Sequence, residues 1–129
     1  MKESKLPKRF WLIIAVAMIL VSMIGSNLVQ SDGGKVKIHK VNLVVADGAE
    51  LYAQMYIPEQ ARAEHKLPLV IVQHGSQHNL QMQDMNMVEL ARRGFIVISG
   101  DAFGHGSSTP RGFVDPSMNF ANMRYLLEY

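Results

Sequence analysis

Two stretches of the chain decide its fold, PLVIVQHGSQHN at residues 68–79 and GFIVISGDAFGHGSS at residues 94–108. Each contains a short, continuously apolar and β-branched run (LVIV and FIVI), which is typical of a strand buried on both faces of a parallel sheet. Residues 84–93 between them carry part of an apolar face and are followed by Gly94, which indicates a helix with a glycine stop. Strand, helix and strand together predict a parallel β-α-β unit, the core of an α/β fold.

An antiparallel hairpin is predicted before this unit. Apolar residues alternate over residues 36–45 and again over residues 51–57, which predicts two strands. The Asp47–Gly48 pair between them is typical of a hairpin turn. The first alternation slips by one residue near His39–Lys40, and we expect a β-bulge there.

Residues 116–129 predict a further helix, and no strand pattern follows it. We therefore expect an incomplete α/β domain at residues 35–129, in which the hairpin precedes the parallel unit and later strands are missing. The segment QSDGG at residues 30–34 predicts a short flexible linker before this domain.

The N-terminal segment carries the pattern of a membrane helix. Residues 10–29 contain no charged residue, and about 20 residues span roughly 30 Å as a helix, which matches the apolar core of a bilayer. We predict that residues 10–29 contact the lipid bilayer and that residues 1–29 form a basic tail with a signal-anchor helix. The tail favours a cytoplasmic N-terminus and a single-pass protein of the cell membrane with an extracytoplasmic remainder. Its basic residues are Lys2, Lys5, Lys8 and Arg9.

A cleaved signal peptide is the main alternative, because a charged start followed by an apolar run fits both. A cleavage site requires small residues at its last and third-last positions. Cleavage after Gly25 would place Met23 third-last, and cleavage after Ser26 would place Ile24 there, so the retained anchor is favoured.

The bulk composition excludes some partners. The 13 Lys and Arg residues against 11 Asp and Glu residues give a net charge of +2 without a clustered basic patch, so no nucleic-acid partner is expected. The chain has no cysteine, which excludes disulfides and thiolate metal sites.

The stretch PLVIVQHGSQHN…MVELARRGFIVISGDAFGHGSS, preceded by ADGAELYAQMYIP, resembles the α/β-hydrolase superfamily. The resemblance covers about Lys35 to Tyr129. It is most similar to the serine-peptidase and esterase branches, including membrane-bound examples. A strand that ends in His-Gly and a strand that ends in Asp-x-x-Gly-His-Gly-x-Ser carry it. Phe103 departs from the pattern, because such loops often carry Arg at that position.

The resemblance implies acyl transfer on a small-molecule ester or peptide substrate. It implies that the loop after His-Gly supplies backbone N–H groups of an oxyanion hole, which stabilise the negative charge on the carbonyl oxygen. The N–H of Ser76 is the first candidate and that of Gln77 the second. Glycine at position 75 is expected to let the backbone turn closely enough to aim the amide inward. The residues implied to structure the two loops are His74, Gly75, Asp101, Gly104, His105 and Gly106.

The same residues are also compatible with metal or phosphate binding. His74 and His78 have the i, i+4 spacing of helical zinc ligands, but Gly75-Ser76 favours a loop, and no third ligand is evident. Residues 104–106 form a G-x-G that lacks the Lys-Ser/Thr of a phosphate-binding loop. No metal and no cofactor is therefore predicted.

Asp101 with His105 fits either an acid–base pair or a loop brace. Ser107 and Ser108 lack the spacing of a nucleophile and favour turn hydrogen bonds.

The nucleophile motif G-x-S-x-G of an α/β-hydrolase does not occur in the chain. Gly100 and Gly104 are the only glycines with its spacing, and Ala102 lies between them. The resemblance places the serine, the acid and the histidine after Tyr129, so no triad residue is present. We expect these residues to be an N-terminal fragment that is inactive alone. The alternative is a non-catalytic, membrane-tethered binding or structural domain on the same scaffold.

Overall fold

The computed structural model describes residues 7–45, 48–110, 123–127 and 129. Most of the helix predicted at residues 116–129 lies outside these ranges, and residues 123–127 are helical. The elements in chain order are α1 (Lys8–Gln30), β1 (Val36–Val44), β2 (Glu50–Pro58), β3 (Leu69–Gln73), the 3₁₀ helix η2 (Leu80–Gln83), α2 (Asp84–Arg92) and β4 (Ile96–Gly100).

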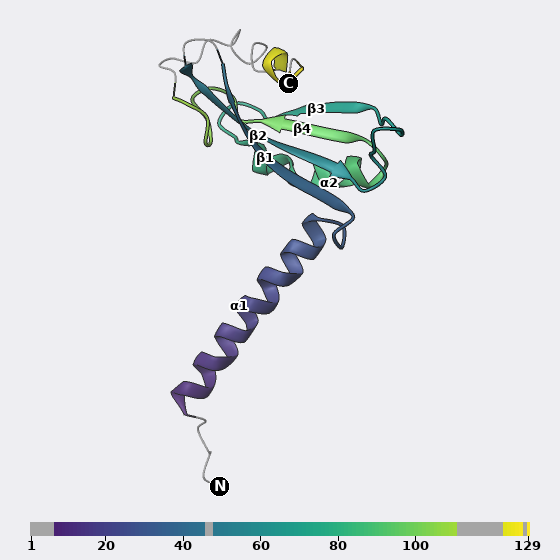
Figure 1. Ribbon diagram of the computed structural model, residues 1–129. Coiled ribbons are helices and arrows are strands. Elements are labelled where there is room, and N and C mark those ends of the chain that lie inside the picture. Colours follow the sequence, from purple (N-terminus) through teal and green to yellow (C-terminus); the bar gives the residue numbers. More distant parts are fainter. Residues whose placement is uncertain (1–6, 46–47, 111–122, 128) are drawn as a thin grey trace.

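The four strands form one sheet in the order β1-β2-β4-β3. β1 pairs with β2 and β2 with β4 in antiparallel fashion, whereas β3 and β4 are parallel. The predicted α/β fold, with an antiparallel hairpin followed by a parallel β-α-β unit, is confirmed. Because β3 and β4 are parallel, the loops that follow them lie next to each other at the carboxyl-terminal end of these strands (Figure 1).

Each face of the sheet packs against its own apolar core. On one face, β2 and β4 pack against α2 around Tyr56, Met87 and Val97. On the other face, Ile98 packs with Phe103 and Leu126. Figure 1 shows α2 and the short helical segment near the C-terminus on opposite sides of the sheet. Burying both faces of β4 is what stabilises the central strand.

The predicted β-bulge at His39–Lys40 is wrong. β1 and β2 pair one to one from Val36↔Pro58 to Val44↔Glu50 without an inserted residue. The alternation slips because Ile38 packs into the core beneath α2, whereas Leu43 packs into the core on the opposite face. An uninterrupted strand presents alternate residues to opposite faces, so a strand that contributes to both cores changes its apolar phase.

β3 is less buried than its apolar sequence predicts. Its residues Val70–Gln73 are half-buried, and Leu69 is 48% exposed. β3 lies at the edge of the sheet, and within the described chain no strand covers its outer side. A strand is fully buried only when other parts of the chain cover its faces and its outer side. The apolar sequence of β3 does not show whether such neighbours are present.

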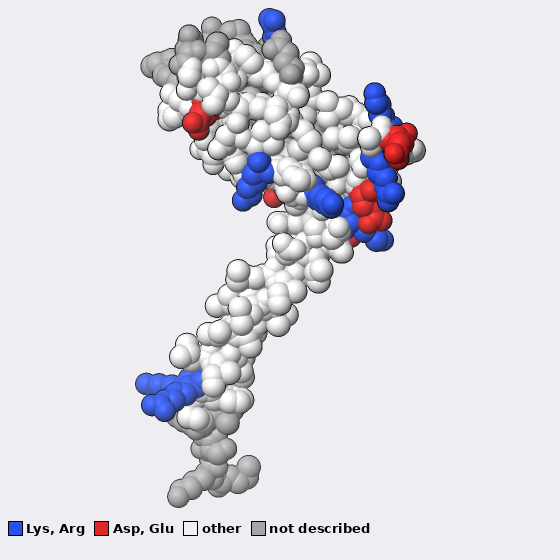
Figure 2. Space-filling view, viewed as in Figure 1, with Lys and Arg blue, Asp and Glu red and all other residues white. Residues whose placement is uncertain are grey.

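α1 projects from the sheet as a bare helix (Figure 1). None of its residues is buried, and it is long and apolar enough to cross a bilayer, although a signal sequence has the same properties. Figure 2 shows basic side chains at its start and an uncharged surface from there to the sheet domain.

A hydrogen-bonded turn joins α1 to β1. The N–H of Gly33 donates to Leu28 O at 2.7 Å, and the N–H of Val36 donates to Ser31 O at 2.9 Å. Asp32 in this turn forms an ion pair with Arg92 at the end of α2, at 3.1 Å. The turn thus connects α1 to α2 as well as to β1.

Candidate active-site loops

Two loops form the candidate site at the carboxyl-terminal ends of β3 and β4, and this end of the sheet is called the site edge below. The β3 loop is defined as residues 74–79 and the β4 loop as residues 101–109. Sites in α/β sheets form at this edge, because loops from neighbouring parallel strands converge there. A hollow of about 370 Å³ lies between the loops, lined by Gln77, His78, Asn79, Met82, Gly104, His105 and Gly106.

His74 ties the start of the β3 loop to the β4 loop. Its side chain is buried, and its Nε2 accepts the N–H of Ala102 at 2.9 Å. Nε2 is therefore unprotonated, and Nδ1–H donates to the carbonyl of Gly75 at 2.8 Å. Both ring nitrogens are used within the protein, which leaves neither free to act as a base or to bind a metal.

Asp101 is a fully buried carboxylate that braces both loops. Its Oδ1 accepts the N–H of Leu80 at 2.7 Å, and its Oδ2 accepts the N–H of Ser107 at 2.8 Å. Hydrogen bonds from amides replace the hydration that burial removes from the charge. No local sequence pattern indicates the bond from the Leu80 amide, because Leu80 lies 21 residues before Asp101.

Gly106 lies directly against the carboxylate of Asp101. Its φ is 50°, and a Cβ at this position would collide with all three atoms of the carboxylate group. Only glycine combines this left-handed conformation with so close an approach. Gly104, with φ 83°, also adopts the left-handed region.

Ser108 and Thr109 fasten the end of the β4 loop to β2. The Ser108 hydroxyl donates to Asp101 O at 2.6 Å and accepts the N–H of Tyr52 at 2.9 Å. The Thr109 hydroxyl accepts the N–H of Glu50 at 2.9 Å. These serine and threonine bonds hold the β4 loop in one conformation and leave Ser108 unable to serve as a free nucleophile.

The β3 loop contains a tight turn with two free amides. The N–H of His78 donates to Gly75 O at 3.3 Å, and Gln77 has φ 64°, which together match a type II turn over residues 75–78. Within the described chain, the N–H groups of Ser76 and Gln77 donate to no acceptor. The loop therefore presents two unused donors beside the hollow.

Gly75 does not make the close backbone turn that is expected to require glycine at this position. Its φ is not in the left-handed region, and an added Cβ would make only an ordinary 3.5 Å contact with His78. The left-handed residue is Gln77, one position after Ser76. Gly75 structures the loop through its carbonyl, which accepts from both His74 and His78.

The structure does not bring together an Asp101–His105 acid–base pair or a metal-binding group of side chains. Asp101 directs its carboxylate to two amides and not to His105, whose Nδ1 lies 3.3 Å from Phe103 O. His105 instead packs near His74, with 5.3 Å between ring centroids. Among the residues that the structure describes, no three His, Asp or Glu side chains form a metal-binding group.

The shifted pKa values lie outside both loops. Burial raises the pKa of the Asp84 carboxyl at the start of α2, and the hydrogen bond from Tyr56 opposes this shift. Burial, with the Asp84 charge second, also raises the pKa of the Tyr56 hydroxyl, which lies 3.2 Å from Asp84 Oδ1. This pair joins β2 to α2 and does not face the hollow between the loops.

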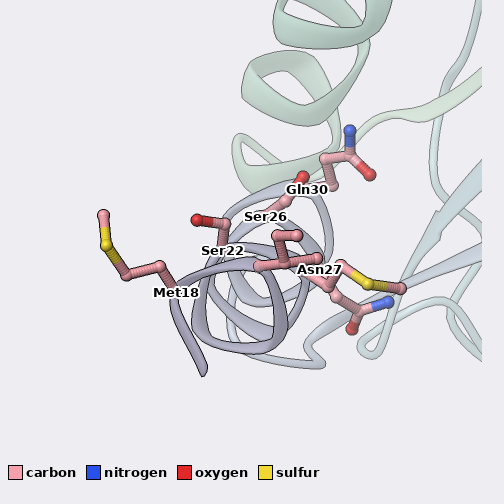
Figure 3. A pocket seen from close by; sticks show the side chains of 7 residues that line it. Met18, Ser22, Ser26, Asn27 and Gln30 are labelled. Carbon is pink, nitrogen blue, oxygen red and sulfur yellow. The ribbon is translucent and has the colours of Figure 1, made fainter. Parts of the chain in front are cut away.

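A second hollow, of about 660 Å³, lies along the bare surface of α1. Figure 3 shows that its labelled side chains, including Ser22, Ser26 and Gln30, all come from this one helix. No titratable side chain lines it, so it offers no group for acid–base chemistry.

Solved structures identify the fold defined by this sheet and these loops: the chain has the α/β-hydrolase fold. It is similar to a hydrolase from Pseudomonas aeruginosa PA01, with a TM-score of 0.56 and 27% identity over 70% of the chain. It is also similar to an esterase from Exiguobacterium antarcticum, with a TM-score of 0.55 and 19% identity over 70% of the chain. Epoxide hydrolase A from Mycobacterium thermoresistibile matches 71% of the chain with a TM-score of 0.57 and 20% identity.

The chain spans only about a third of these proteins: 32% of the hydrolase, 31% of the esterase and 28% of the epoxide hydrolase. No family model and no curated protein matches it. The similar structures include enzymes that act on different bonds, so the shared fold does not specify a reaction.

Proposed function

We propose that the chain is the N-terminal part of a membrane-anchored serine hydrolase that cleaves an ester or peptide bond by acyl transfer. In this proposal the β3 loop supplies one side of the oxyanion hole, through the backbone N–H groups of Ser76 and Gln77. The β4 loop holds the β3 loop in position. The nucleophile, the acid and the histidine base come from residues beyond Tyr129.

The single observation that carries the proposal is the pair of unused amides. In the described part of the chain, the N–H of His78 donates to Gly75 O and that of Leu80 to Asp101 Oδ1, whereas the N–H groups of Ser76 and Gln77 in the same turn donate to no acceptor. An oxyanion hole requires donors that are fixed before the charge develops and that no protein acceptor already occupies. His74 and Asp101 supply the fixing from two directions.

The open edge of β3 supports a continuation of the sheet. β3 is the outer strand of the described sheet, and no described strand pairs with the backbone N–H and C=O groups on its outer side. A further strand could pair with these groups and would stabilise the edge. Such a strand would also place its own following loop beside Ser76, where a nucleophile is needed.

The membrane part of the proposal rests on α1. Its apolar length fits one crossing of the bilayer, and the basic residues before it favour a cytoplasmic N-terminus. The hydrolase domain would then lie outside the cytoplasm.

The test is to read the coding sequence beyond the codon for Tyr129. The proposal predicts a short apolar strand followed by G-x-S-x-G, then an acidic residue and a histidine further on. Purified full-length protein is expected to hydrolyse 4-nitrophenyl acetate and to lose this activity when the motif serine is changed to alanine. A strand without this serine, or a stop codon directly after Tyr129, would favour the non-catalytic tethered domain instead.

A further inference from the structure

The hollow between the β3 and β4 loops has a polar lining. Its side chains are those of Gln77, His78, Asn79, Met82 and His105, and the remaining surface is the backbone of Gly104 and Gly106. No Lys, Arg, Asp or Glu side chain lines it. Met82 is the one large apolar side chain, so the hollow offers little surface for a long acyl chain.

The hydrogen-bonding groups of this lining are available. In the described chain, the amides of Gln77 and Asn79 and the imidazole of His78 bond to no other protein group. Each of these three residues presents both donor and acceptor capacity. A ligand with amide or hydroxyl groups can therefore be satisfied from three consecutive residues.

The nearest fixed charge is unavailable to a ligand. The Asp101 carboxylate lies beneath Gly106, fully buried, and its two oxygens already accept the amides of Leu80 and Ser107. A cationic ligand in the hollow would find no exposed carboxylate, and an anionic ligand would find no lysine or arginine. Either kind of charged group would lose hydration without gaining a Lys, Arg, Asp or Glu partner of opposite charge.

The backbone at Gln77 holds this surface in place. Its left-handed conformation, at φ 64°, costs roughly 1–2 kcal/mol for a residue other than glycine. Gln77 lines the hollow and directly follows Ser76 in the same turn. A substrate group bound in the hollow would thus lie next to the carbonyl that the Ser76 and Gln77 N–H groups are proposed to bind.

We infer that this hollow is a substrate subsite for an uncharged, amide-bearing group next to the bond that is cleaved. The inference rests on the proposed function, because it assumes that the Ser76 and Gln77 amides bind the reacting carbonyl oxygen. It narrows the substrate class to short, neutral, polar acyl groups such as an N-acylated amino acid.

The experiment compares three 4-nitrophenyl esters on the full-length, membrane-anchored protein. N-acetylglycyl and pentanoyl esters have acyl chains of equal length and differ in the amide, and the succinyl ester adds a negative charge. The wild-type protein is expected to show a kcat/KM at least tenfold higher for N-acetylglycyl than for either other ester. This preference corresponds to one or two hydrogen bonds.

Two variants locate the preference in the hollow. Asn79→Leu and His78→Phe remove hydrogen-bonding groups at similar volume, and each is expected to lower the ratio of N-acetylglycyl to pentanoyl kcat/KM about three- to tenfold. Gln81→Leu is the matched control, because Gln81 is exposed on η2 but does not line the hollow. It is expected to leave the ratio unchanged.

The outcomes separate the two claims. If the wild-type protein hydrolyses all three esters at similar kcat/KM, or if Gln81→Leu lowers the ratio as much as Asn79→Leu does, the subsite is overturned while the proposed function stands. If the protein hydrolyses none of the esters, nor 4-nitrophenyl acetate, the proposed function fails and the subsite fails with it.

Discussion

The two loops at the site edge differ in how their polar groups are used. In the β4 loop, Asp101 and Ser108 are buried, and their polar side-chain atoms bond to backbone groups within the loop and to those of Leu80 and Tyr52 in other segments. In the β3 loop, residues 75–78 are exposed, and the amides of Ser76 and Gln77 remain unbonded within the described structure. The buried polar side chains of the β4 loop thus have hydrogen-bond partners, whereas two backbone N–H groups of the β3 loop have none in the described chain.

This difference separates support from chemistry. The β4 loop contributes bonds that hold its neighbour, through Ala102 to His74 and through Asp101 to Leu80. The β3 loop keeps two exposed N–H donors that no protein group in the described chain accepts. A substitution that breaks one of the bonds of the β4 loop should therefore lower stability. Removal of a free N–H group from the β3 loop should leave stability unchanged and lower activity.

Exchanging a glycine in each loop sharpens the contrast most. Gly106→Ala is expected to lower the free energy of unfolding by about 3 kcal/mol or more, because the new Cβ collides with the Asp101 carboxylate at a left-handed position. Gly75→Ala is expected to cost less than about 1 kcal/mol, since the Cβ has room beside His78. Urea unfolding of the detergent-solubilised protein measures both. Equal losses would show that the β4 loop is not the braced one.

A pair of serine substitutions tests the same contrast at smaller scale. Ser108→Ala leaves the N–H of Tyr52 and the carbonyl of Asp101 without their partner, and we expect a loss of about 2–3 kcal/mol. Ser76→Ala removes an exposed hydroxyl, and its effect should stay within about 0.5 kcal/mol. The same unfolding experiment applies, and a Ser108→Ala protein as stable as wild type would contradict the bracing role.

The smallest effect is expected outside both loops, at Asp84. Its folded-state pKa is raised by burial above the ordinary value of 3.8. The stability that this group contributes is therefore present below about pH 3.8 and is lost as pH rises through the folded pKa. Asp84→Asn keeps an acceptor for Tyr56 and should remove this loss, which raises stability at pH 7 by less than about 1 kcal/mol because solvent reaches the group. Stability measured from pH 3 to 7 checks it, and a variant with an unchanged pH slope would refute it.

The elements that could be predicted from the sequence are those with local patterns. The apolar run of β4 and the face of α2 are properties of adjacent residues, and the stop at Gly94 fits its φ of 92°. The burial of β3 could not be predicted, since it depends on neighbours in the sheet. The phase slip in β1 predicts a bulge from the sequence alone, because the sequence does not show that the two cores lie on opposite faces of the sheet.

The site could be predicted in position but not in detail. Strand ends followed by His-Gly and by Asp-x-x-Gly-His-Gly located both loops. The bond from Ala102 to His74 joins residues 28 apart, and no local pattern reports such a contact. The left-handed backbone at Gln77 was equally unpredictable, because this conformation usually selects glycine or asparagine.

The most direct measurement of the central claim deletes one amide of the β3 loop. Proline is favoured at the second position of a type II turn, so Ser76→Pro removes the N–H of residue 76 while the turn is kept, and Ser76→Ala retains the N–H as the matched control. In the full-length enzyme, Ser76→Pro is expected to lower kcat about 10²- to 10³-fold relative to Ser76→Ala, with both proteins equally stable to urea. Equal kcat values for the two variants would contradict the assignment of this amide to the oxyanion hole.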